Sequence, residues 1–155
     1  MWELSELNRF IVTAKSNSYV AGAKPSASCR LGSHDVGYTS EGWRYLDSYF
    51  GGSDFAGQEV VWVKDEPVWA MNYFGRILVP ALIDAAKAGT VIKAALQYMY
   101  VEENRFLGGM DFDHALARYH DRSVGDCSHF RGREIIVVAG REAYELHYHG
   151  GLIKP

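Results

Sequence analysis

The chain has 155 residues, of which 48% are hydrophobic and 14% aromatic, and its formal net charge is −3. This length and composition predict one compact domain over residues 1–155 with a single hydrophobic core. The sequence lacks a cluster of Lys and Arg, which binding to phosphate backbones or to anionic lipids requires. We therefore expect no nucleic acid and no membrane among its partners.

The first predicted element is an amphipathic helix over residues 3–15, marked by the spacing of Leu4, Leu7 and Ile11. An amphipathic segment lacks the continuous apolar run of a signal peptide, so we expect a cytoplasmic location. Residues 16–37 are rich in Ser, Gly and Ala. They predict a long ordered loop or a weak strand, and long loops in compact domains are often functional.

An aromatic block from Trp43 to Arg76 comes next, and its composition favours strands. Pro80 then opens a predicted helical segment that runs to about Tyr100 and that we expect Gly89 to interrupt. More strands are predicted after this segment. The predicted strands cover residues 42–50, 58–64, 68–74, 114–124, 134–138 and 143–149.

The connections between strands are of hairpin length within each half of the chain, which favours antiparallel pairing. The sequence therefore predicts an α+β fold in a single domain. An antiparallel sheet of about six strands should carry the N-terminal helix and the central helical segment packed on it. We expect no internal repeat.

Asp47 is the first candidate for a functional residue, because strand alternation places it on the same face as Tyr45 and Tyr49. A carboxylate among rings needs a partner or a raised pKa. Asp47 is thus a candidate general acid or base, or an acceptor for a ligand. The alternative is a structural acceptor bonded to a tyrosine, to Arg44 or to loop amides. Asn72, on a strand with two apolar faces, would orient a ligand or tie a loop to the sheet.

His34 and Asp35 lie together in the polar loop before the first predicted strand. Loops of this kind carry binding and catalytic residues. The pair is a candidate oriented base, and the alternative is an Asx-turn or strand-entry role for Asp35.

Glu145, His147 and His149 alternate along the last predicted strand and so point to one face. A His-x-His pair on a strand, completed by a carboxylate, is a geometry that binds metal ions. The competing interpretation is an exposed polar face opposite the apolar residues of the same strand. We expect no metal site. If the protein binds a metal ion, these three residues are the candidate ligands.

Several longer stretches of sequence together carry a resemblance to a known family. They are Gly32–Asp35, Asp47–Gly52, Gly57–Trp62, Pro67–Arg76 and Tyr148–Gly151. With these motifs the chain resembles a bacterial family known only as a domain of unknown function, whose members occur alone or appended to helix-turn-helix regulators of the Xre type. The resemblance implies one intact domain and no particular reaction.

Three functional hypotheses follow. The leading one is a sensor-like domain that binds a small molecule in an aromatic-lined pocket and needs no cofactor. The second is a cofactor-independent hydrolase, isomerase or lyase, in which Asp47 or Glu59 pairs with His149 as acid–base groups and the partner is a small-molecule substrate. The third is a protein-interaction module, and a homodimer is left open. The expected ligand-binding residues are His34, Asp35, Tyr45, Tyr49, Trp62, Trp69, Asn72 and Tyr73.

Overall fold

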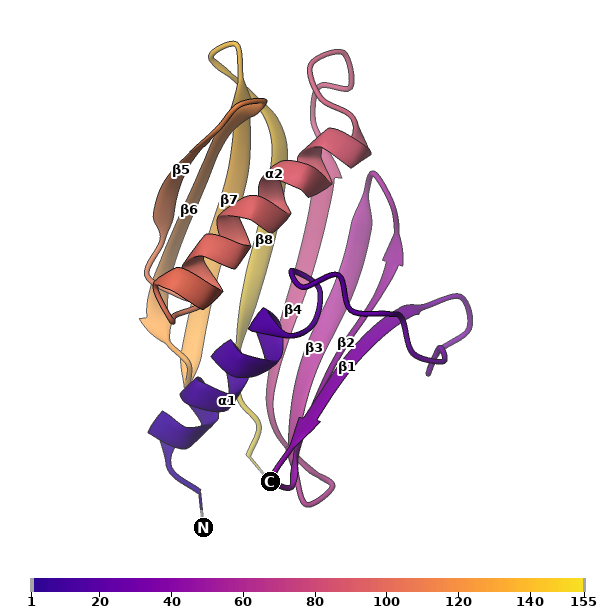
Figure 1. Cartoon of the computed structure of the whole chain (residues 1–155), viewed down its shortest axis with the longest axis vertical. Helices are drawn as coiled ribbons and strands as arrows, with labels where there is room; N and C mark the ends of the chain where they lie inside the picture. The colour runs from indigo at the N-terminus through magenta and orange to yellow at the C-terminus, as the bar shows by residue number, and fades with distance from the viewer. Residues whose placement is uncertain (1, 155) are drawn as a thin grey trace.

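A computed structural model of the chain describes residues 2–154. Eight antiparallel strands form one sheet, and both α-helices lie against the same face of it (Figure 1). In chain order the elements are α1 (Leu4–Ser16), β1 (His34–Ser40), β2 (Trp43–Gly51), β3 (Phe55–Val63), β4 (Glu66–Ile77), α2 (Ala85–Gln97), the π-helical turn η1 (Tyr98–Glu102), β5 (Met110–His114), β6 (Ala117–Asp126), β7 (His129–Val138) and β8 (Arg141–Leu152).

The predicted α+β fold with its two helical segments is confirmed, but the sheet has eight strands rather than about six. The two strands that the sequence did not reveal, β1 and β5, are the edge strands of the sheet. Edge strands pair on one side only and hold few apolar residues, so their local pattern is weak. The expected interruption of the second helix at Gly89 is wrong, because α2 continues through it from a cap at Asp84.

The strand order β1-β2-β3-β4-β8-β7-β6-β5 divides the molecule into two equivalent halves. Each half is a 13-residue helix followed by a four-stranded antiparallel meander. The halves meet where β4 pairs with β8, and Tyr73 there lies opposite Tyr148. The register is symmetric about this point, since the pair of Trp69 with Leu152 is matched by the pair of Tyr144 with Ile77. The halves are therefore related by a local two-fold axis between β4 and β8.

Short sequence motifs repeat between the halves, which corrects the expectation of no internal repeat. The motif Arg-Tyr-x-Asp occurs at residues 44–47 and 118–121. The motif Phe-x-Gly-x-Glu occurs at residues 55–59 and 130–134. Both motifs occupy equivalent positions, because Asp47 pairs with Glu59 across β2 and β3 as Asp121 pairs with Glu134 across β6 and β7.

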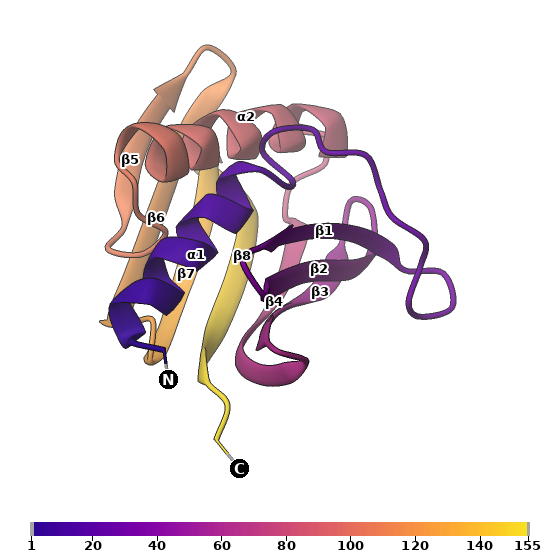
Figure 2. The same cartoon turned by 60° about the horizontal axis from the view of Figure 1, so that its bottom comes forward.

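The two helices also match position by position. The fully buried side chains of α1 recur in α2 at the same places, and α1 contacts β1 and β2 as α2 contacts β5 and β6. Figure 2 shows the two helices side by side over the sheet. No helix within residues 2–154 is long and apolar enough to cross a membrane. The matched buried positions are Leu7, Phe10, Ile11 and Ala14 in α1, and Ala88, Val91, Ile92 and Ala95 in α2.

Candidate functional site

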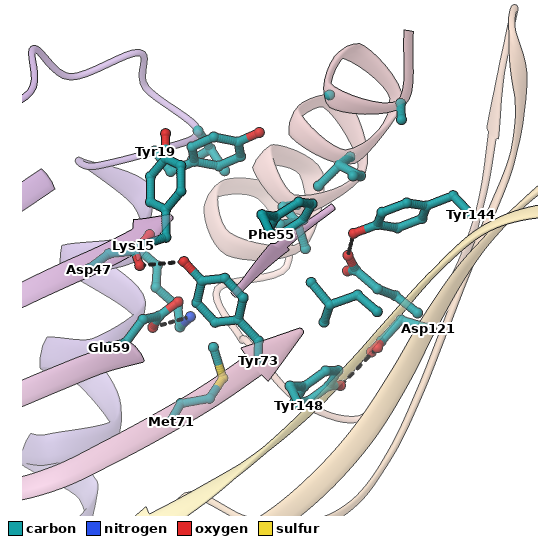
Figure 3. Close-up of a pocket in the computed structure, with 18 of the residues that line it drawn as sticks. Lys15, Tyr19, Asp47, Phe55, Glu59, Met71, Tyr73, Asp121, Tyr144 and Tyr148 are labelled. Carbon is teal, nitrogen blue, oxygen red and sulfur yellow. Dashed lines mark hydrogen bonds and ion pairs between the residues drawn. The ribbon is translucent and has the colours of Figure 1, made fainter. Parts of the chain in front are cut away.

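A cavity of about 270 Å³ lies between the inner face of the sheet and the two helices. Gly52, Ser53 and Ala85 line it and are exposed, so it opens to solvent between the β2–β3 turn and the start of α2. Both halves contribute tyrosine rings and carboxyl groups to its wall (Figure 3). The carboxyl groups are those of Asp47, Glu59, Asp121 and Glu134, and Lys15 is the cation beside them.

In the first half, a tyrosine and a lysine partner the two carboxyl groups. The hydroxyl of Tyr73 donates to Asp47 Oδ1 at 2.6 Å, and Lys15 Nζ lies 2.5 Å from Glu59 Oε2 (Figure 3). Glu59 Oε2 lacks a hydrogen bond of ordinary geometry, yet the short ion pair satisfies its charge. Lys15 and Glu59 are both buried, and an ion pair so placed is costly to break from one side.

A glycine makes the tyrosine–aspartate contact possible. Gly57 lies between Tyr73 and Tyr49 in the sheet, and a Cβ on it would come within 2.3 Å of the Tyr73 ring. The missing side chain therefore lets the ring lie across β3 and reach Asp47 on β2. Gly132 does the same in the second half, where a Cβ would come within 2.1 Å of Tyr148.

In the second half, tyrosines alone partner the carboxyl groups. Tyr119 and Tyr144 both donate to Glu134, the latter at 2.9 Å to Oε1. Tyr148 donates to Asp121 Oδ1 at 2.8 Å (Figure 3). The other oxygen, Asp121 Oδ2, is buried and has no hydrogen-bond partner among the described residues.

The two halves differ in where the positive charge lies. Lys15 stands at position 12 of α1, and the same position of α2 holds Leu96. Both side chains line the cavity. The second half thus contributes no lysine of its own at this helix position, although the charge of Lys15 also acts on Glu134 and lowers its pKa.

Three of the four carboxyl groups hold their protons more tightly than usual. Burial raises the pKa of Asp47 to about 7, and the neighbouring Glu59 adds to the shift. Burial likewise raises the pKa of Glu134 to about 7 and that of Asp121 to about 6, although tyrosine hydroxyls that donate to them oppose the shift. Such values lie close to neutrality, where a small change of environment decides the charge.

The tyrosines of the wall remain protonated. Burial, together with the nearby carboxylates, raises the pKa of Tyr45, Tyr100 and Tyr119 well above its ordinary value. The same causes raise the pKa of Tyr73 and Tyr148. Their hydroxyls therefore act as neutral hydrogen-bond donors over the whole physiological range.

The structure brings five of the sequence-predicted residues together at the cavity, and these are Asp47, Glu59, Tyr45, Tyr49 and Tyr73. Trp69 does not belong to the wall. It is fully buried in the core beside the cavity, and its indole N–H donates to the carbonyl of Cys127 at 2.9 Å.

Trp62, Asn72 and His149 lie on the outer face of the sheet, because each alternates with a residue whose side chain points inward. Asn72 accepts a hydrogen bond from Gln58 at 2.9 Å, and the Arg44 guanidinium lies over the Trp62 ring. None of the three lines the cavity, and Trp62 instead lines a separate hollow with Asp35 and Arg44. An acid–base pair of Asp47 or Glu59 with His149 is not formed, since the two partners lie on opposite faces.

His34 and Asp35 lie at the start of β1, away from the cavity wall. Asp35 accepts from the amide of Cys29 and from the hydroxyl of Ser48, at 2.8 and 2.7 Å. Burial alone would raise the pKa of Asp35, but hydrogen bonds from Cys29, Ser48 and Ser33 outweigh it and lower the pKa well below its ordinary value. Asp35 ties the loop before β1 to β2, which is a structural role, and His34 is exposed beside the Tyr49 ring.

The alternative metal site is not formed either. Arg76 and Arg133 both donate to Glu145, which lowers the pKa of this carboxyl to about 2. His147 and His149 are exposed. Among residues 2–154 no three His, Cys, Asp or Glu side chains are placed to hold a metal ion.

Sequence reasoning missed Lys15 and the second-half residues of the site, among them Asp121, Glu134 and Tyr148. The signal for three of them was present in the repeated motifs Arg-Tyr-x-Asp and Phe-x-Gly-x-Glu and in the Tyr-x-Gly at residues 73–75 and 148–150. Identities at alternate positions are easily overlooked when the intervening outer-face residues differ. No local pattern distinguishes Lys15 from the exposed lysines of the chain.

The fold and site define an α+β domain with an internal duplication and an acidic, aromatic cavity that is open at one end. The chain belongs to the family described as a domain of unknown function (DUF5680), whose model matches residues 47–153. The matched part includes all four cavity carboxyl groups. Neither curated proteins nor solved structures gave a match to the chain.

Proposed function

We propose that the protein is a sensor-like domain that binds a small molecule in the cavity between the sheet and the helices. The observation that carries this proposal is the cavity itself, about 270 Å³ in volume and open at one end. Apolar side chains and rings form most of its wall, and a few buried polar groups converge on it. Sites for small molecules have this composition.

The buried carboxyl groups support a binding role over a purely structural one. A core needs no carboxyl groups, and burying them costs free energy. Four of them on one cavity wall are therefore better explained by an occupant that interacts with them. The resemblance to bacterial domains appended to Xre-type regulators is the basis for a sensor-like role, in which a bound ligand changes the activity of a partner.

A thermal-shift screen with small cationic, neutral and anionic compounds tests the proposal. We expect at least one class to raise the melting temperature of the protein in a saturable manner. The variant Ala88→Leu places extra volume in the cavity and should abolish the response, whereas Ala94→Leu, on the same helix but outside the wall, should retain it. A screen in which no class stabilises the protein, or in which Ala88→Leu responds fully, contradicts the proposal.

A second candidate function is acid–base catalysis without a cofactor. The observation that favours it is the raised pKa of Asp47 and Glu134, about 7 in each case, which suits proton transfer near neutrality. His149 has no part in it, because it lies on the outer face. Turnover of a compound found in the screen, measured by mass spectrometry, distinguishes an enzyme from a binding domain.

The third hypothesis, an interaction module with exposed rings, has the weakest support. Of the four tryptophans, Trp69 is fully buried and the other three are partly buried. Phe50 and Phe74 are the exposed rings of the aromatic block.

A further inference from the structure

The unequal charge of the two halves leads to a specific ligand class. Glu59 and Glu134 occupy equivalent positions, and so do Asp47 and Asp121. The first pair has the ammonium group of Lys15 at 2.5 Å from Glu59. In the second half Leu96 takes the helix position of Lys15, and the positive charges that act on Asp121 are those of Arg122 and Arg105.

Asp121 is the group left without a full set of partners. Its side chain is 3% exposed and lines the cavity, and Oδ2 has no hydrogen bond among the described residues. A buried carboxylate oxygen without a partner costs free energy, unless a proton or a donor from outside supplies one. Neighbouring atoms cover Oδ2, so a donor that enters through the cavity satisfies it once the side chains around it move aside.

The arginines near Asp121 are bound elsewhere. Arg122 donates two hydrogen bonds to the carboxylate of Asp111, at 2.8 and 3.0 Å. Arg105 donates to the carbonyl of Leu107 at 2.7 Å and forms an ion pair with Glu103. The Arg122 guanidinium also donates to the backbone carbonyl of Asp121 at 2.6 Å, but neither guanidinium group donates to the Asp121 carboxyl among the described residues. The titratable and charged groups around Asp121 are Tyr148, Glu134, Tyr100, Tyr119, Arg122 and Arg105.

We propose that the cavity binds an organic cation, a protonated amine on an apolar or aromatic body, with its ammonium group against Asp121 Oδ2. This inference rests on the proposed binding function and names its ligand class. In the first half Lys15 Nζ pairs with Glu59, but its counterpart Glu134 already accepts from Tyr119 and Tyr144. The ammonium group therefore goes to the neighbouring carboxyl group, that of Asp121. The rings of the wall, including Tyr100 and Tyr119, receive the apolar body and favour a cation near their faces.

Binding of this kind depends on pH in a defined direction. The ammonium group binds the ionised form of Asp121, whose pKa burial raises to about 6. The affinity for an amine should therefore fall as the pH drops from 7.5 through about 6. A neutral ligand of the same shape should show no such loss.

Calorimetric titration with phenethylamine, tryptamine and 1-naphthylmethylamine tests the proposal, with the matching alcohols and carboxylic acids as controls. We expect at least one amine to bind at least about tenfold more tightly than its alcohol and its acid. Asp121→Asn should weaken the amine about tenfold or more, whereas Asp126→Asn, a surface change, should leave its affinity unaltered. Circular dichroism and the melting temperature confirm that each variant is folded.

The outcomes separate this inference from the proposed function. If alcohols or acids bind in a manner that Ala88→Leu abolishes and amines do not, the cation proposal is wrong and the binding function stands. If an amine binds equally well to Asp121→Asn, the cation proposal is likewise wrong. If no compound of any charge binds, both fail.

Discussion

The two halves of the molecule contribute equivalent residues to the cavity wall, but the carboxyl groups of each half have different partners. In the first half a lysine of α1 is paired with Glu59 inside the protein. In the second half the tyrosines Tyr119, Tyr144 and Tyr148 share the two carboxyl groups, and one oxygen of Asp121 is left free. In this duplicated fold, the carboxyl groups of the first half are thus paired with a lysine of the protein. Those of the second half can pair with the cation of a ligand.

The largest expected effect comes from removing the internal cation. Lys15→Leu gives α1 the residue that α2 has, and it leaves Glu59 and Asp47 buried without a counter-charge. We expect the free energy of unfolding to fall by about 3 kcal/mol at pH 8, and by less at pH 5, which lies below the raised pKa of Asp47. Chemical denaturation at the two pH values measures this.

A double-mutant cycle provides the control for Lys15. Adding Glu59→Gln to Lys15→Leu should recover part of the lost stability, because the unpaired carboxylate is removed. If Lys15→Leu loses the same stability at both pH values, and the two substitutions show no coupling, the Lys15–Glu59 ion pair does not stabilise the fold.

The glycines beneath the tyrosines should be equally sensitive in the two halves. Gly57→Ala and Gly132→Ala each push a tyrosine ring away from its aspartate, since the new Cβ would lie within 2.3 Å of the ring. We expect each to lower the free energy of unfolding by about 2 kcal/mol, as for other overpacked sites. Gly37→Ala is the matched strand control, because its Cβ would make ordinary contacts. A large effect at one site and none at the other would contradict the structural equivalence.

Removing the tyrosine hydroxyl that donates to the aspartate should cost more stability in the second half than in the first. Tyr148→Phe removes the one side-chain hydrogen bond of Asp121, and it should cost about 1.5 kcal/mol at pH 8. Tyr73→Phe removes the equivalent bond of Asp47, which still has Lys15 nearby, and it should cost less. Equal costs in thermal and chemical unfolding would argue against the asymmetry.

The last prediction concerns the slope of stability against pH. Because burial raises the pKa of Asp47 from 3.8 to about 7, its folded state binds a proton more tightly than its unfolded state. Stability is therefore lost as the pH rises from 3.8 towards 7, at up to about 1.4 kcal/mol per pH unit for one group. Asp47→Asn should flatten the slope up to about pH 7, and Asp121→Asn only up to about pH 6. If the slopes are unchanged in both variants, Asp47 and Asp121 are not the groups whose protonation makes stability depend on pH.

The site residues of the first half could largely be predicted from the sequence, and those of the second half could not. Alternation alone identified Asp47 as a carboxyl group among rings, and the strand pattern supplied Glu59, Tyr45 and Tyr73. Asn72 was placed in the pocket because both faces of its strand look apolar. The face it occupies is decided by the register of the sheet, which a local pattern does not contain.

The residues of the second half and of α1 required the fold. Asp121 and Glu134 lie 74 and 75 residues after their counterparts, and only the pairing of β4 with β8 shows that they share a cavity with Asp47. Lys15 reaches this cavity because α1 packs against β1 and β2. The two-fold symmetry of the fold therefore accounts for which residues meet at the cavity, and no single sequence motif does so.

A crystal structure with bound 4-bromophenethylamine tests the central claim most directly, because the bromine scatters anomalously and the ammonium group can then be placed. We expect the ammonium nitrogen about 3 Å from Asp121 Oδ2, with the ring among the tyrosines of the wall. An ammonium group bound instead at Glu59, or outside the cavity, would contradict the claim that a ligand supplies the cation of the second half.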